Sequence, residues 1–136
     1  MIWVLHMSNP LLSIAVSWIA CQCILKPLIA SFKAGHFVPE AVWWQGGMPS
    51  GHAALVGALC SAIAKSEGFG TIAFSTATVF SLIVLYEALV TRNMLMRQTE
   101  ALQSLTKHKL QPVVGHQPLE VAAGLAVGIL VARYVM

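Results

Sequence analysis

Two short stretches decide the fold of this chain, Gly46-Gly47-Met48-Pro49-Ser50-Gly51-His52 and Gly115-His116-Gln117-Pro118-Leu119-Glu120. Each opens a long apolar run, and each places a histidine where that run begins. The first backbone N–H groups of a helix are unpaired and carry a partial positive charge, which suits an anion such as phosphate. The two stretches therefore predict two membrane helices, each with a histidine at its N-terminal end.

The composition supports a membrane setting. Of the 136 residues, 57% are hydrophobic and only 10% are charged, against roughly 25% charged residues in soluble domains. The length fits a single membrane domain, residues 1–136. The net charge of +3 comes from eight basic residues spread through apolar sequence, so no basic stripe for nucleic acid is expected. Lipid headgroups or phosphorylated substrates are the expected partners.

Four segments are apolar and long enough to cross a bilayer, for which roughly 17–25 residues are needed. They are residues 10–32, 50–66, 71–91 and 118–136. Lys26-Pro27 predicts a kink in the first segment, and Pro118 suits the first position of the last helix. Residues 93–106 alternate apolar and polar positions with helical spacing, which predicts an amphipathic helix at the membrane surface. The predicted fold is an all-α integral membrane bundle of about four transmembrane helices plus one interfacial amphipathic helix.

Threading four spans through a membrane brings most of the polar groups to one side. That side holds Lys26, Lys33, His52, Glu87, Arg92, Arg97, Lys107, Lys109, His116 and Glu120. Only Lys65 and Arg133 among the basic residues lie toward the other side. The positive-inside rule makes the basic-rich side cytoplasmic.

The two histidine motifs have the parts of a phosphoryl-transfer site. Ser50 can cap the second helix, and the N–H groups around Gly51 can bind an anion. If the last helix begins near His116, Glu120 lies on the same helical face and can hold the imidazole in one tautomer, as in an oriented nucleophile. The simpler alternatives are an interfacial His52 beside an ordinary helix cap and a surface His116–Glu120 pair.

The remaining acids and cations have similar alternatives. Glu87 lies inside the third span, where a carboxylate is costly unless paired or functional. It could form an ion pair with Arg92 or Lys26, and Lys26 could instead extend to the interface. The chain has no Asp, which excludes an aspartate-rich Mg²⁺ site. No metal and no cofactor are expected.

These motifs together resemble the type 2 phosphatidic acid phosphatase superfamily, and especially its small divergent branch, the acid phosphatase/vanadium-dependent haloperoxidase-related family. The resemblance rests on the two histidine motifs in this order, Tyr86-Glu87 followed by Arg92, Gln98 with Leu102, and Gln22 with Lys26. The chain departs from the superfamily pattern at Lys33-Ala34, where Arg-Pro is usual, at Leu110, where an arginine is usual, and at Glu120, where an aspartate is common.

The resemblance implies roles for particular residues. His116 would attack phosphorus, Glu120 would orient it, and His52 would protonate the leaving group. The phosphoryl oxygens would be bound by Lys26, Lys33, Ser50, Gly51, Arg92 and Lys109. Glu87 would have a structural or orienting role.

The expected function is therefore metal-independent hydrolysis of a lipid phosphate through a phosphohistidine. Phosphatidate-like, phosphatidylglycerophosphate-like and isoprenyl phosphates are the expected substrates. The expected location is a bacterial inner membrane or a plastid-type membrane, with the site facing the cytoplasm or its equivalent. The alternatives are a catalytically weak or inactive protein that binds or translocates a phospholipid headgroup, and a subunit of a membrane complex. A homo-oligomer also stays open.

Overall fold

A computed structural model of the protein describes residues 9–44, 46–106, 110 and 114–136. All regular structure in these residues is helical. In chain order the elements are α1 (Pro10–Trp18), η1 (Ile19–Leu25), α2 (Lys26–Ala34), η2 (Pro39–Trp43), α3 (Gly51–Ser66), α4 (Ile72–Tyr86), η3 (Glu87–Thr91), α5 (Arg92–Thr106) and α6 (Pro118–Val135). The predicted all-helical membrane bundle is confirmed.

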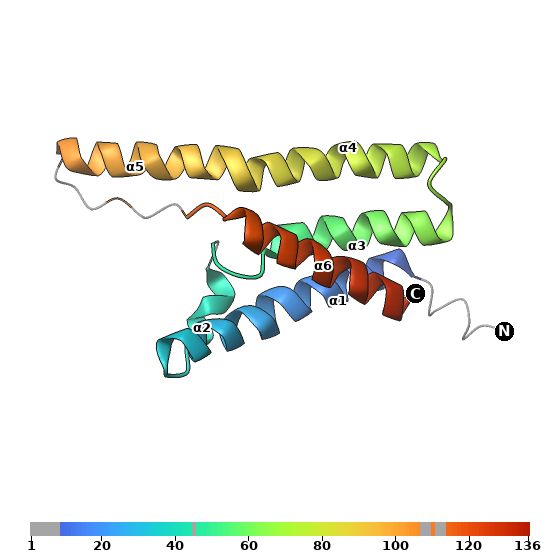
Figure 1. The fold of residues 1–136 in the computed structure, drawn as a ribbon, viewed down its shortest axis with the longest axis horizontal. Coiled ribbons are helices and arrows are strands. Elements are labelled where there is room, and N and C mark those ends of the chain that lie inside the picture. Colours follow the sequence, from blue (N-terminus) through green and yellow to red (C-terminus); the bar gives the residue numbers. More distant parts are fainter. Residues whose placement is uncertain (1–8, 45, 107–109, 111–113) are drawn as a thin grey trace.

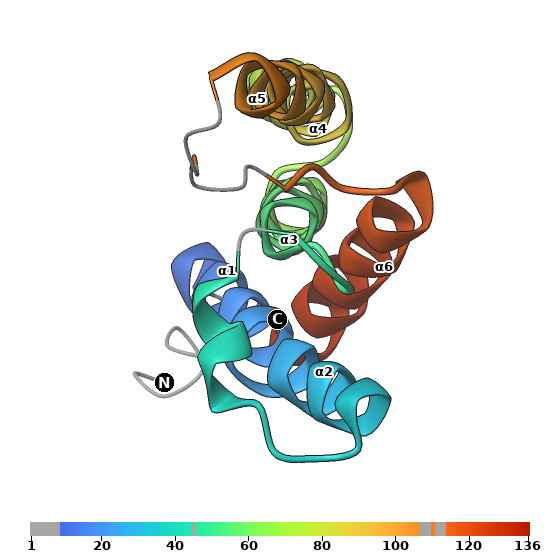
Figure 2. The same ribbon diagram turned by 90° about the vertical axis from the view of Figure 1, so that its left-hand side faces the viewer.

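Three of the helical rods are long and apolar enough to cross a membrane. They are Pro10–Ala34, Ile72–Thr106 and Pro118–Val135, by length and composition among the described residues. The helix in the second predicted segment, α3, has 16 residues, about one fewer than the shortest usual span. Seven of its residues are buried, so α3 is the central helix of the bundle. Figure 2 shows α3 between α4–α5 on one side and α1 on the other, with α6 alongside.

Small residues allow α3 and α6 to pack closely. Gly124 and Gly128 on α6 lie directly against the backbone carbonyls of Ser50 and Ala54, where a Cβ atom would clash. Close backbone contact through small residues is a common way to join helices in a membrane, because the lipid removes the usual hydrophobic driving force. The start of α6 is therefore fixed beside the start of α3.

Two of the long rods contain a π-helical turn. η1 separates α1 from α2, and η3 separates α4 from α5. η1 ends immediately before Lys26-Pro27, where the sequence predicts a kink. The predicted amphipathic segment is α5, which continues from α4 through η3 as one rod of 35 residues and extends beyond the other helices (Figure 1). π-helical turns occur frequently at functional sites.

The helix ends lie at the two ends of the bundle in the arrangement that the predicted order of membrane crossings requires. Figure 1 places the starts of α3 and α6 toward the same end as α2, and the start of α1 and the end of α6 at the opposite end. Ser50 caps α3, since its side chain accepts a hydrogen bond from the N–H of Ala53. Pro118 is the first residue of α6.

Candidate functional site

His116 and Glu120 meet, although they do not share a helical face. α6 begins at Pro118, so His116 lies in the extended segment before the helix. The expectation that both residues occupy one face of a helix is therefore wrong, because Pro118 and the N-cap Gln117 start the helix two residues late. Contact is made by the glutamate side chain, which reaches back so that Oε2 lies 3.0 Å from His116 Nδ1. The same Oε2 accepts a hydrogen bond from the Gln117 N–H at 3.1 Å.

This contact leaves one ring nitrogen of His116 unused. An ionised carboxylate can only accept hydrogen bonds, so Nδ1 carries a proton, and in the neutral imidazole the lone pair is then on Nε2. Nε2 is buried and has no hydrogen-bond partner among the described residues. A buried imidazole with a carboxylate on Nδ1 and a lone pair on Nε2 is the arrangement of an oriented nucleophile or general base.

The backbone of His116 is held by the π-helical turn η3. The His116 N–H donates to the carbonyl of Ala88 at 3.3 Å. Asn93 Nδ2 donates to the carbonyls of His116, at 3.1 Å, and Leu89, at 2.7 Å. Gly115 packs so tightly against Asn93 that a Cβ atom would clash with its side chain. Asn93 thus positions His116, and sequence reasoning missed it because a single asparagine beside a helix boundary gives no specific signal.

The two motif loops are joined directly. The Ser50 N–H donates to the carbonyl of Glu120 at 3.0 Å. His52 follows in the first turn of α3, and its side chain is exposed. Arg92, Glu87, His116 and Lys26 lie near enough to His52 to interact with it electrostatically. The residues that the two motifs contribute therefore lie in one electrostatic environment.

Lys26 is buried and hydrogen-bonded. Only 2% of it is exposed, so it does not extend to the interface as the alternative supposed. Its Nζ donates to the carbonyl of Trp44 at 2.9 Å and to Gln22 Oε1 at 3.0 Å. Gly51 packs against that same Gln22 oxygen, and a Cβ atom there would clash. Gln22 thus links Lys26 to the start of α3, and the charges of Glu120 and Arg92 both act on Lys26.

Glu87 forms the ion pair that the sequence left open. Arg92 Nε lies 2.8 Å from Glu87 Oε1, with the arginine side chain 17% exposed and the glutamate 42%. The pair spans η3, so the π-helical turn that holds the His116 backbone also positions the guanidinium.

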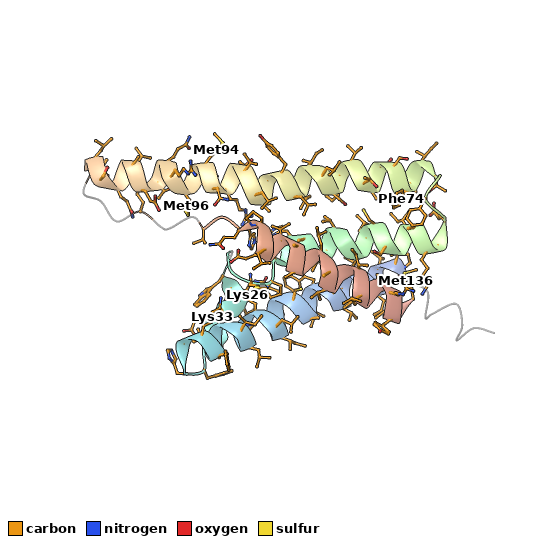
Figure 3. All side chains as sticks on the ribbon, in the orientation of Figure 1. Lys26, Lys33, Phe74, Met94, Met96 and Met136 are labelled. Atoms are coloured by element: carbon orange, nitrogen blue, oxygen red, sulfur yellow. The ribbon has the colours of Figure 1, made fainter. Side chains whose placement is uncertain are left out.

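Two predicted phosphate-binding residues do not join this cluster. Lys33 is exposed near the end of α2, beyond Lys26 (Figure 3), and among the described residues no hydrogen bond or ion pair joins it to the others. Lys109 lies outside the described residues. The same described part of the chain contains no group of three His, Cys, Asp or Glu side chains that could hold a metal ion.

The part of the chain that matches known proteins includes every residue of this site. A sequence profile described as the Divergent PAP2 family matches residues 7–131. The chain is also similar to a Bacillus subtilis (strain 168) protein named "Uncharacterized membrane protein YuiD", at 29% identity over 144 residues, covering 89% of each chain. No solved structure matches.

Proposed function

The chain belongs to the Divergent PAP2 family, and from that premise we propose that it is a membrane-embedded, metal-independent phosphatase of lipid phosphates. The observation that carries the proposal is the hydrogen bonding of the two ring nitrogens of His116. Glu120 occupies Nδ1 at 3.0 Å, while the buried Nε2 has no partner among the described residues. A nucleophilic histidine needs one ring nitrogen held by a hydrogen-bond partner and the other ring nitrogen available to attack phosphorus.

The proposed reaction proceeds in two displacements. In the first, His116 Nε2 attacks phosphorus, a P–N bond forms and the P–O bond to the lipid breaks. His52 donates a proton to the departing alkoxide as general acid. In the second, water attacks the phosphohistidine and gives a proton back to His52, the P–N bond breaks and inorganic phosphate leaves. Glu120 keeps the proton on Nδ1 and stabilises the positive charge that develops on the ring.

The cations and helix ends would stabilise the phosphoryl oxygens. Lys26 and Arg92 supply charge, and the Ser50 hydroxyl and the N–H groups of the first turn of α3, beginning at Gly51, supply donors. Lys33 and Lys109 remain proposed contributors to phosphate binding. Since His116 is only 1% exposed, the reaction requires neighbouring side chains to move aside when the phosphate enters. Candidate substrates are phosphatidate-like, phosphatidylglycerophosphate-like and isoprenyl phosphates.

One observation favours a second candidate function. Lys33 replaces an arginine of the superfamily pattern and lies exposed, apart from the cluster, and lysine cannot bind phosphate in the bidentate way that arginine can. A site with fewer bidentate contacts could bind or translocate a phospholipid headgroup without cleaving it.

The experiment that separates the two functions is phosphate release by the purified protein in detergent, measured over a panel of lipid phosphates. The phosphatase proposal expects release by the wild-type protein and none by His116→Ala. The headgroup-binding function expects both proteins to bind the lipids and neither to release phosphate. That second result would overturn the phosphatase proposal.

A further inference from the structure

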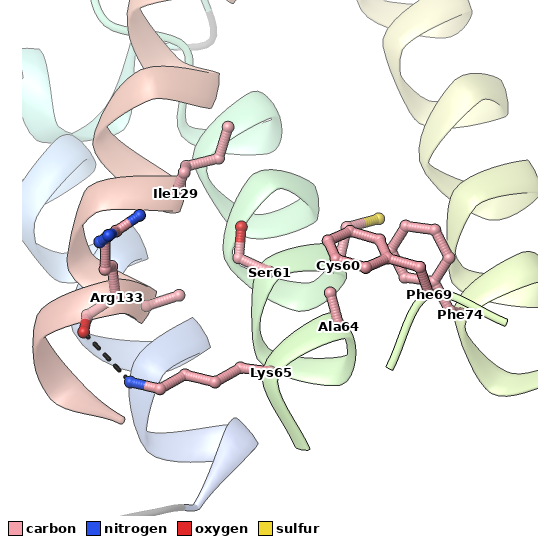
Figure 4. A pocket seen from close by; sticks show the side chains of 9 residues that line it. Cys60, Ser61, Ala64, Lys65, Phe69, Phe74, Ile129 and Arg133 are labelled. Carbon is pink, nitrogen blue, oxygen red and sulfur yellow. Dashed lines mark hydrogen bonds between the residues drawn. The ribbon is translucent and has the colours of Figure 1, made fainter. Parts of the chain in front are cut away.

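A cavity lies at the end of α3 remote from His52. Its volume is about 590 Å³, within the roughly 300–1,000 Å³ of ordinary ligand sites. α3 forms the floor, while α6 and α4 lie on its two sides (Figure 4). None of the residues implicated in phosphatase chemistry lines this cavity.

Most of the lining is apolar. Ala64 belongs to the floor, Ile129 to the α6 side, and Phe69 and Phe74 to the α4 side. The two phenylalanine rings pack edge to face, with centroids 5.1 Å apart and an interplanar angle of 78°. A surface of this kind accepts a hydrocarbon chain rather than a free inorganic ion.

Two cations lie at the α6 side of the same cavity. Lys65 reaches across from α3, and its Nζ donates to the backbone carbonyl of Arg133 at 3.3 Å, as Figure 4 shows. Both side chains are exposed, and none of the nine described lining residues is acidic. The bond of Lys65 to the end of α6 is ordinary helix-end stabilisation, but it does not engage the guanidinium of Arg133.

We infer that this cavity binds one anionic phospholipid. The phosphate is held between Lys65 and Arg133, and one acyl chain lies over Ala64 between α4 and α6. The combination of an apolar floor with paired cations at one side matches a molecule that is charged at one end and hydrocarbon at the other. Basic pockets between membrane helices recognise anionic headgroups in this way. The inference does not depend on the phosphatase proposal.

The test measures lipid bound to the purified full-length protein by native mass spectrometry. The probes are phosphatidylglycerol and phosphatidylcholine with identical acyl chains. Phosphatidylglycerol carries no phosphomonoester, so the proposed phosphatase reaction does not consume it. The wild-type protein should retain one phosphatidylglycerol in preference to phosphatidylcholine.

The variants separate charge from cavity shape. Arg133→Gln leaves the carbonyl that accepts from Lys65 intact and should weaken phosphatidylglycerol binding about fivefold, the usual worth of one cation near a headgroup. Ala64→Phe fills the floor while keeping both cations, and it should abolish the retention of phosphatidylglycerol. Arg97→Gln removes an exposed arginine on α5, away from the cavity, and should change nothing. Unaltered binding by Arg133→Gln, or equal loss in Arg97→Gln, would overturn the inference.

Discussion

Replacing Glu120 tests whether the orientation of His116 underlies the chemistry. Both hydrogen bonds to the carboxylate end on one atom, because Oε2 accepts from His116 Nδ1 and from the Gln117 N–H. In Glu120→Gln the amide oxygen can keep both bonds. The flipped amide would instead point its NH₂ group at a backbone N–H, which is two donors face to face. The Gln117 N–H thus keeps the oxygen in place, and the imidazole retains its orientation.

The expected rate loss follows from this geometry. Glu120→Gln removes the charge but not the acceptor, so the charge-assisted bond of about 1.5–3 kcal/mol becomes a neutral one of about 0.5–1.5 kcal/mol. The difference of about 1–1.5 kcal/mol corresponds to a rate loss of roughly 5- to 13-fold. Glu120→Ala removes the acceptor and frees the ring to rotate or change tautomer, and a histidine held in the wrong tautomer costs about 10⁴-fold in the serine-protease site.

The assay is phosphate release from a lipid phosphate, with an acid-labile phosphohistidine assay run in parallel. Glu100→Gln is the matched control, since it removes the same charge from an exposed position on α5 and should leave the rate unchanged. Equal rates for Glu120→Gln and Glu120→Ala, or a wild-type rate for either, would refute the reasoning.

Four further predictions follow from the site and the topology. His52→Ala should slow release of a lipid alkoxide roughly 10²–10⁴-fold and be partly rescued by a nitrophenyl phosphate, whereas His116→Ala should lose both activities; equal rescue would mean the roles are misassigned. Activity should survive EDTA and be inhibited by vanadate, which resembles the phosphoryl transition state; loss on chelation that Mg²⁺ restores would contradict the mechanism. In a cysteine-free background, an impermeant thiol reagent applied outside intact cells should label Gly68→Cys but not Ala34→Cys, and the reverse pattern would overturn the orientation. Asn93→Ala should lower the free energy of unfolding by about 1–3 kcal/mol, measured by denaturation in detergent, and an unchanged stability would contradict its role in holding His116.

The sequence predicts the helices well because apolar runs and helix caps are local signals. Ser50 and Pro118 mark two helix starts on their own. The π-helical turns η1 and η3 could not be predicted, since a single wide turn changes the hydrophobic pattern of a mostly apolar helix very little. The amphipathic character of 93–106 is visible in the sequence, but its continuity with α4 is not.

The site is predictable where its residues are neighbours in sequence and not where tertiary contacts create it. His116 and Glu120 are four apart, and the spacing indicates a pair even though the helix begins later than expected. Asn93 contacts His116 across 23 positions, which no spacing rule reveals. Lys33 fits the family motif by count, yet seven residues along a helix place it about 10 Å beyond Lys26.

The 35-residue rod from Ile72 to Thr106 also fixes the depth of the site. At about 1.5 Å per residue it is about 52 Å long, whereas the hydrocarbon layer is only about 30 Å thick. α4 and η3 together, Ile72 to Thr91, rise about 30 Å and use up that thickness. If the rod stands upright and the hydrocarbon layer begins at Ile72, that layer ends near Arg92, and α5, which has no buried residue, continues past it. On that placement, Arg92, Asn93 and the His116 loop beside them lie at the level of the lipid phosphates.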